Sequence, residues 1–203
     1  YIFNIKIVMN YWPDGIKHIQ KIDPIFQNYG IKKKVLNINK SAFEVLFNSI
    51  CSQQISTSAA QSIQIKSKLI FKKISLTNFT SNLNEINRLP ITGNKKKCLI
   101  SLVNFLNKNK SIKWRSLSDQ EVHNHLIDVF GIGPWTIQMF NIFYRGSSDI
   151  IPLKDIGFIN SYKKYYNDPQ LKDLNFYINK WSPYGTIITM NLWLAYDGKP
   201  VDL

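Results

Sequence analysis

The chain has few cysteines and no long apolar run, and each shortage excludes a class of protein. Its two cysteines, Cys51 and Cys98, are too few to hold an iron–sulfur cluster or a structural zinc site between them. We expect both to be reduced, buried thiols. No stretch is apolar enough to predict a membrane-spanning helix, and the first ten residues do not show the layout of a signal peptide. These features favour an intracellular protein.

Acidic residues are scarce beside basic ones. The sequence has 13 Asp and Glu against 26 Lys and Arg, which gives a formal net charge of +13. Such an excess favours a polyanionic partner, above all a nucleic acid. The chain is also rich in asparagine and isoleucine, a pattern that an A+T-rich genome imposes. Genome composition therefore accounts for part of the lysine excess. For this reason the net charge alone is only modest support for a nucleic-acid partner.

Strand signals are almost absent, because the sequence lacks alternating apolar patterns and hairpin turns of the Asn-Gly kind. Apolar residues recur at helical spacing instead, for example in the predicted helix at 13–29 and in the helices that begin at Ser41 and Lys95. Asp23-Pro24 predicts a break inside the first of these. We therefore predict an all-α protein of roughly eight to ten helices. A length of 203 residues suits one compact domain or two small subdomains. The three histidines form no metal-ligand pattern with the cysteines or carboxylates.

A helical hairpin is predicted at about residues 118–145. Ser118 can cap its first helix, and Glu121 completes a capping box. Gly131 ends that helix, and Gly133 is expected where a side chain would clash with the turn. Pro134 suits the first turn of the second helix. The turn between the helices exposes backbone N–H groups that suit a phosphate, although a lone Gly-x-Gly is more often an ordinary helix–helix turn.

Two motifs in a fixed order favour the phosphate-binding turn over the ordinary helix–helix turn. The first is Gln-Gln-Ile-Ser at 53–56, and the second is Gly-Ile-Gly-Pro-Trp-Thr at 131–136, followed by Pro152 and Asp155. Together they resemble the helix-hairpin-helix DNA glycosylases, and most of all the DNA-3-methyladenine glycosylase II group. The resemblance spans roughly residues 16 to 198. Ordered motifs are far more specific than any one of them alone.

The resemblance implies a fold and a set of DNA contacts. It implies one domain over residues 1–203, in which two packed helical subdomains flank a cleft and the N- and C-terminal parts pack together. The residues implied to contact double-stranded DNA are Gln53, Gln54, Ser56, Gly131, Ile132, Gly133 and Thr136. By position, Gln54 would fill the gap left by an extruded nucleotide. The better-known bacterial members carry a leucine there, so the role of Gln54 as a wedge stays open.

The resemblance makes Asp155 the catalytic carboxylate. Breaking the C1′–N bond of a nucleotide gives the sugar positive character, which a fixed carboxylate stabilises while it positions the attacking water. The alternative is that Asp155 only caps a helix. The lyase-type relatives carry a lysine where this chain has Trp135, and an indole forms no Schiff base with the sugar. The sequence therefore predicts a monofunctional glycosylase.

Trp135, Met139 and Trp193 match the positions of residues that line the base pocket in the family. Alkylated purines such as 3-methyladenine and 7-methylguanine are cationic, and an electron-rich aromatic face attracts them more than neutral bases. The alternative for both tryptophans is core packing.

The predicted function is excision of alkylated purines in base excision repair. Two alternatives stay open: a non-catalytic protein that binds damaged DNA, and a glycosylase for deaminated or oxidised bases. We expect a monomer without a cofactor, acting where the DNA is (the nucleoid or the nucleus). A monovalent cation at the hairpin carbonyls is implied by the resemblance alone.

Overall fold

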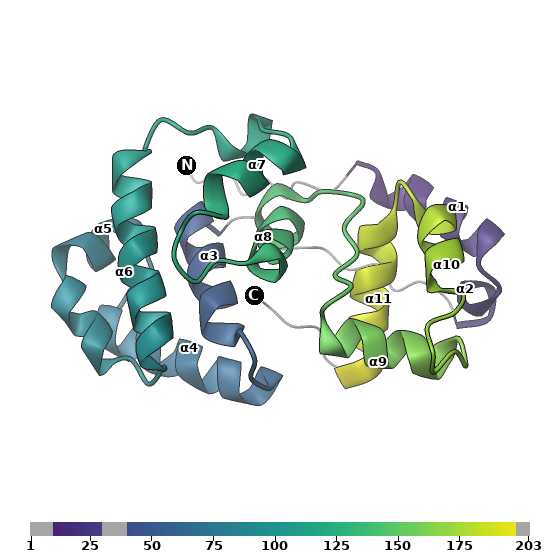
Figure 1. Cartoon of the computed structure of the whole chain (residues 1–203), viewed down its shortest axis with the longest axis horizontal. Coiled ribbons are helices and arrows are strands. Elements are labelled where there is room, and N and C mark those ends of the chain that lie inside the picture. The colour runs from purple at the N-terminus through teal and green to yellow at the C-terminus, as the bar shows by residue number, and fades with distance from the viewer. Residues whose placement is uncertain (1–9, 30–39, 198–203) are drawn as a thin grey trace, which may run out of the picture. The chain divides into compact units, whose positions relative to one another are not determined.

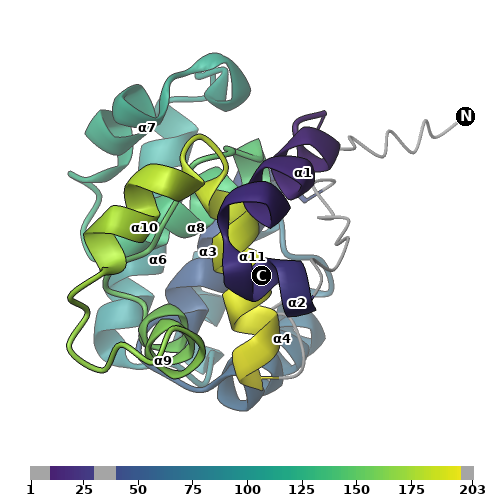
Figure 2. The same cartoon turned by 90° about the vertical axis from the view of Figure 1, so that its right-hand side faces the viewer.

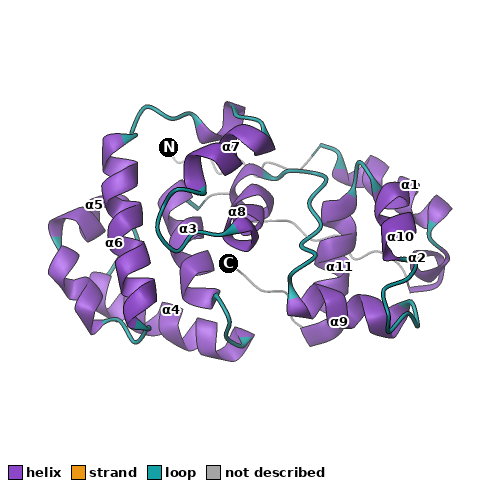
Figure 3. Cartoon of the chain, in the orientation of Figure 1, coloured by secondary structure: helices purple, strands orange, loops and turns teal. Residues whose placement is uncertain are grey.

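The computed structural model describes residues 10–29 and 40–197. These residues form helices and connecting loops, and no strand occurs among them (Figure 3). The prediction of an all-α fold is confirmed. The described part contains eleven α-helices, slightly more than the predicted eight to ten, because short connecting segments such as Leu76–Ser81 form helical turns of their own. No helix in the described ranges is both long and apolar enough to cross a membrane.

The chain divides into two compact units (Figure 1). Residues 10–29 and 146–197 form what we call the terminal unit, because it joins the two ends of the chain. Residues 40–145 form the middle unit. The helices of the terminal unit are α1 (Trp12–Ile22), α2 (Pro24–Tyr29), α9 (Ile156–Tyr165), α10 (Leu174–Trp181) and α11 (Gly185–Asp197).

The middle unit is a bundle around one buried helix. Its helices are α3 (Ala42–Ser52), α4 (Thr57–Phe71), α5 (Leu76–Ser81), the 3₁₀-helix η1 (Leu83–Arg88), α6 (Gly93–Lys108), the 3₁₀-helix η2 (Trp114–Ser116), α7 (Asp119–Leu126), α8 (Pro134–Phe140) and the π-helical turn η3 (Asn141–Arg145). Helix α3 is buried along most of its length and contacts α4, α6 and α8. Phe43 and Phe47 of this unit each meet Phe79 edge to face, an arrangement that aromatic pairs prefer.

Local signals set the starts of these helices. Ser41, Ser56, Ser75, Thr92 and Ser118 each accept a hydrogen bond from the backbone N–H three residues on. At Ser118 the predicted capping box is complete, since Oε2 of Glu121 accepts from the Ser118 backbone N–H at 2.7 Å. The prediction that Gly131 ends this helix is wrong. Helix α7 stops at Leu126, and the chain then turns through bonds from the Val129 N–H to the Leu126 carbonyl and from the Ile132 N–H to the Val129 carbonyl.

The terminal unit packs around α11. This helix contacts α1, α9 and α10, and Figure 2 shows it in the middle of the three. Beside it, the buried carboxylate of Asp23 accepts hydrogen bonds from the hydroxyl of Tyr166 and from the indole N–H of Trp181. Burial, with the adjacent carboxylate second, raises the pKa of Tyr166 far above its usual range. Asp23 also stands at the predicted break between α1 and α2, so this carboxylate ties the N-terminal helices to α9 and α10.

Candidate functional site

Asp155 lies at the start of α9, on a turn closed by its own backbone N–H to the carbonyl of Pro152 at 2.9 Å. Its Oδ1 accepts from the backbone N–H of Phe158 at 2.7 Å, which is the geometry of a helix N-cap. The capping alternative considered for Asp155 therefore describes its local structure correctly. The carboxylate is half-buried, so the cap leaves it partly accessible.

The same oxygen has a second donor that a helix cap does not require. The indole Nε1–H of Trp193, on α11, donates to Oδ1 of Asp155 at 2.8 Å. Trp193 is 8 % exposed, so its ring is held in place by packing. Hydrogen bonds to an ionised acceptor are stronger than those between neutral groups. The Asp155 carboxylate is thus held by donors from two different helices.

Gly157 makes this arrangement possible. A Cβ at position 157 would lie 3.3 Å from Oδ1 of Asp155 and 3.5 Å from Cδ1 of Trp193, so a side chain there would crowd the hydrogen bond between them. No feature of the sequence pointed to Gly157, because its role depends on Trp193, which comes 36 positions later.

The hairpin of the middle unit needs glycine at one of its two positions. Gly131 has φ +80°, and a Cβ there would lie 2.8 Å from Cβ of Cys98. Gly133 has φ −113°, which any residue adopts, and a Cβ there would meet nothing within 4 Å. The expectation of a clash at Gly133 is therefore wrong for contacts within the protein. The two cysteines are free and buried as predicted, and burial raises the pKa of each thiol to about 12.

Gln53 connects the first motif to the second. Its side-chain Nε2 donates to the carbonyl of Gly131 and to Oγ1 of Thr136, both at 3.0 Å. Thr136 is 1 % and Ile132 4 % exposed. These two predicted DNA contacts are therefore buried in the protein. The structure brings the Gln-Gln and Gly-Ile-Gly motifs together within one unit.

Gln54 and Ser56 are exposed, as a DNA contact requires. Gln54 has φ +55°, a left-handed conformation that is uncommon for a residue with a side chain. Ser56 caps α4 through a bond from the Ala59 backbone N–H at 3.3 Å. On α8, Trp135 is half-buried and Met139 is 1 % exposed.

The predicted residues thus form two sets. Asp155 and Trp193 lie in the terminal unit, whereas Trp135, Met139 and all the predicted DNA contacts lie in the middle unit. A pocket shared by the two sets stays a prediction. Within the described ranges, no three His, Cys, Asp or Glu side chains are grouped so that they could hold a metal ion.

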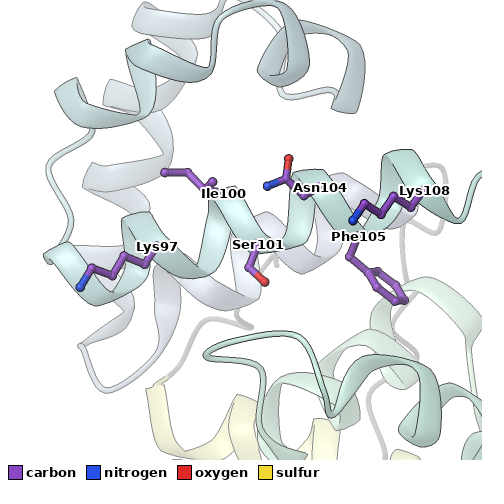
Figure 4. A pocket seen from close by; sticks show the side chains of 6 residues that line it. All are labelled: Lys97, Ile100, Ser101, Asn104, Phe105 and Lys108. Carbon is purple, nitrogen blue, oxygen red and sulfur yellow. The ribbon is translucent and has the colours of Figure 1, made fainter.

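The lysines at the start of α6 differ from one another in what they contact. The ammonium of Lys95 donates to the carbonyls of Cys51 and Gln53, at 2.8 and 2.7 Å, and that of Lys96 donates to the carbonyl of Asn87 at 2.6 Å. Lys97 is exposed and lines an open groove along α6 of about 490 Å³ (Figure 4). None of the predicted site residues lines this groove.

Comparisons with known proteins agree on one class of relatives. No protein-family model matches the chain. A DNA-3-methyladenine glycosylase of Saccharomyces cerevisiae is 31 % identical over 179 residues, covering 77 % of this chain and 60 % of that protein. The YfjP protein of Bacillus subtilis, which carries a DNA-3-methyladenine glycosylase name, is 35 % identical over 84 residues, covering 40 % of this chain and 29 % of that protein. The chain thus spans less than two thirds of the length of both.

A solved structure shows the same fold. The 3-methyladenine DNA glycosylase Mag1 of Schizosaccharomyces pombe, in complex with abasic DNA, superimposes with a TM-score of 0.76 at 21 % identity, covering 89 % of this chain and 95 % of that one. At this level of identity the likeness shows a common fold.

Proposed function

The chain is related in sequence to DNA-3-methyladenine glycosylases and shares the fold of one, and on this basis we propose that it excises alkylated purines from double-stranded DNA. The reaction is hydrolysis of the bond between the base and C1′ of its sugar. The observation that supports the proposal is the doubly held carboxylate of Asp155, which stands where the Gly-Ile-Gly motif and Pro152 lead us to expect the catalytic carboxylate.

The carboxylate acts on the sugar. As the C1′–N bond breaks, positive charge develops on the sugar, and a carboxylate fixed by Trp193 and the Phe158 backbone N–H stabilises that charge without reorganising. The same group orients the water that attacks C1′ and accepts its proton. Both electrons of the broken bond leave with the base. A cationic alkylated purine departs as a neutral base, so the reaction does not demand a strong general acid.

We assign the contacts with DNA to the middle unit. A target base must leave the stack before its sugar can be attacked. We assign that step to the exposed turn at Gln54, whose side chain would occupy the gap, and to the hairpin at 131–133, whose backbone would hold a phosphate. The open space at Gly133 leaves room for a close approach of the DNA backbone. Trp135 and Met139 are assigned to the base pocket, where an indole face favours a cationic base.

One feature supports the finer assignment to the monofunctional, type II group. Trp135 stands where a lyase would need a lysine, so the product would be an abasic site in an uncut strand. The excess of 13 positive charges suits a DNA partner, and we expect the protein to act as a monomer.

The test is the release of free 3-methyladenine and 7-methylguanine from methylated duplex DNA by the purified protein. The proposal predicts release of base and intact strands until alkali or heat cleaves the abasic site. Tight binding to damaged duplex without base release would show a binding protein instead. A panel that includes hypoxanthine, uracil and 8-oxoguanine would identify a glycosylase for other bases.

A further inference from the structure

We propose that Lys95 is a positioning residue that fixes the Gln53–Gln54 turn against the hairpin, so that Gln54 can hold a base out of the DNA stack. This inference rests on the proposed function, but its structural half does not require catalysis. It assigns a role to a lysine that the DNA itself need not touch.

The ammonium of Lys95 points back at the end of α3. It donates to the carbonyls of Cys51 and Gln53, which belong to the last turn and the C-cap of that helix. Carbonyls at a helix C-terminus lack intrahelical partners and carry negative partial charge, so a cation there stabilises them. The amine is partly buried, and burial lowers its pKa, with the nearby Cys51 opposing that effect. A lysine that only served a solvated face would not be placed in this way.

Gln53 extends this attachment to the hairpin. Lys95 holds the backbone carbonyl of Gln53, while the Gln53 side chain donates to Gly131 and Thr136. Gln53 is therefore held through both its backbone carbonyl and its side chain. The last turn of α3, the first turn of α6 and the hairpin are joined through it into one piece.

Gln54 follows directly, in the left-handed conformation at φ +55°. A residue with a side chain keeps this conformation only where its surroundings impose it. Two contacts hold Gln54 in this conformation. The hydrogen bond from Lys95 fixes the preceding residue, and the cap that Ser56 forms on α4 fixes the chain that follows. A wedge must resist the return of the base into the stack, and a turn held in this way resists better than a mobile one.

The neighbouring lysine provides the control. Lys96 also donates its ammonium to a backbone carbonyl, that of Asn87, but this carbonyl belongs to η1 and not to the turn. Lys95→Met and Lys96→Met therefore remove the same charge and a similar bond at adjacent positions. Any general loss of electrostatic attraction to DNA would affect both variants equally.

Two measurements test the proposal, one on the free protein and one on the complex. In hydrogen–deuterium exchange of the free protein, the hydrogen-bonded amides of residues 51–53, at the end of α3, should exchange about tenfold faster in Lys95→Met than in wild type, and at the wild-type rate in Lys96→Met. With a duplex carrying 2-aminopurine as the extruded base, the fluorescence gained on saturation should fall several-fold in Lys95→Met only. Lys95→Arg, which keeps a cation and several donors, should restore both signals.

The proposal would be overturned if Lys95→Met left the exchange rate unchanged. It would also be overturned if exchange became faster but the 2-aminopurine fluorescence did not fall, or if Lys96→Met had the same effects as Lys95→Met. Should Lys95→Met fail to fold, Lys95→Gln replaces it under the same criteria. If the wild-type protein released no base, the proposed function would fail on its own, and the exchange and fluorescence results would still decide the role of Lys95.

Discussion

Trp193 donates its indole N–H to the same oxygen of Asp155 that caps α9, at 2.8 Å. The bond joins residues 38 positions apart and brings a side chain of α11 onto the first residue before α9. A helix cap needs only the backbone N–H of its own first turn. The extra donor supports the catalytic role proposed for Asp155, and it adds a second proposed role for Trp193 to that of lining the base pocket.

Trp193→Phe tests that role, because it keeps an aromatic ring and removes only the donor. The rate of base release in a single turnover should fall by about tenfold or more, since a hydrogen bond to a charged group contributes roughly 1.5–3 kcal/mol. The affinity for a duplex with an abasic-site analogue should stay close to that of wild type. A loss of affinity with an unchanged rate would instead make Trp193 a stacking residue alone.

Gly157→Ala should separate activity from stability. An added Cβ would lie 3.3 Å from Oδ1 of Asp155, so the carboxylate or Trp193 must shift by a few tenths of an ångström. We expect base release to slow by about tenfold, because catalytic groups tolerate little displacement. Alanine favours helix over glycine by roughly 0.5–1 kcal/mol, so the melting temperature should hold or rise. A variant as active as wild type would show that the close contact is unimportant.

The two hairpin glycines should respond differently to the same substitution. Gly131→Ala places a side chain at φ +80° and against Cys98, and should cost on the order of 1–3 kcal/mol of unfolding free energy. Gly133→Ala meets open space in an extended backbone, so its effect on stability should stay within about 0.5 kcal/mol. Chemical denaturation of both variants measures this difference. If Gly133→Ala weakens DNA binding while stability holds, the space at Gly133 is used by DNA.

The capping box at the start of α7 predicts a pH dependence. Hydrogen bonds from the backbone N–H and then the hydroxyl of Ser118 lower the pKa of Glu121 below its usual value. A carboxyl group with a lowered pKa in the folded state stabilises that state above its unfolded pKa, and this contribution is lost as the pH falls through the folded pKa. Glu121→Gln should therefore melt earlier than wild type at neutral pH, and the gap should narrow in the acidic range. A gap that is constant with pH would contradict this account.

Local signals in the sequence predicted more of the structure than contacts between distant residues did. The Ser118–Glu121 box and the break at Asp23 depend on neighbouring residues, and both are confirmed. The start of α9 at Asp155 likewise follows from its own turn. The sequence predicted a need for glycine at both Gly131 and Gly133, whereas the backbone angles show that only Gly131 needs it for its conformation.

The contacts that the sequence did not predict share a physical cause. Lys95 reaches carbonyls 42 and 44 positions away, and Trp193 reaches a carboxylate 38 positions away. Such pairs are set by how helices pack, and no periodicity in one segment encodes them. The motif order identified Asp155 and Gln53 as residues of interest, but the partners that hold them became visible only in the folded chain.

The most direct test of the account compares wild type with Asp155→Asn in single-turnover release of 7-methylguanine from methylated duplex DNA. Asparagine keeps the side-chain oxygen that caps α9 and accepts from Trp193, so the fold should be preserved while the negative charge is lost. The account predicts an unchanged melting temperature and a rate lower by about 10²–10⁴-fold. A variant that releases base at the wild-type rate would contradict the catalytic role of Asp155.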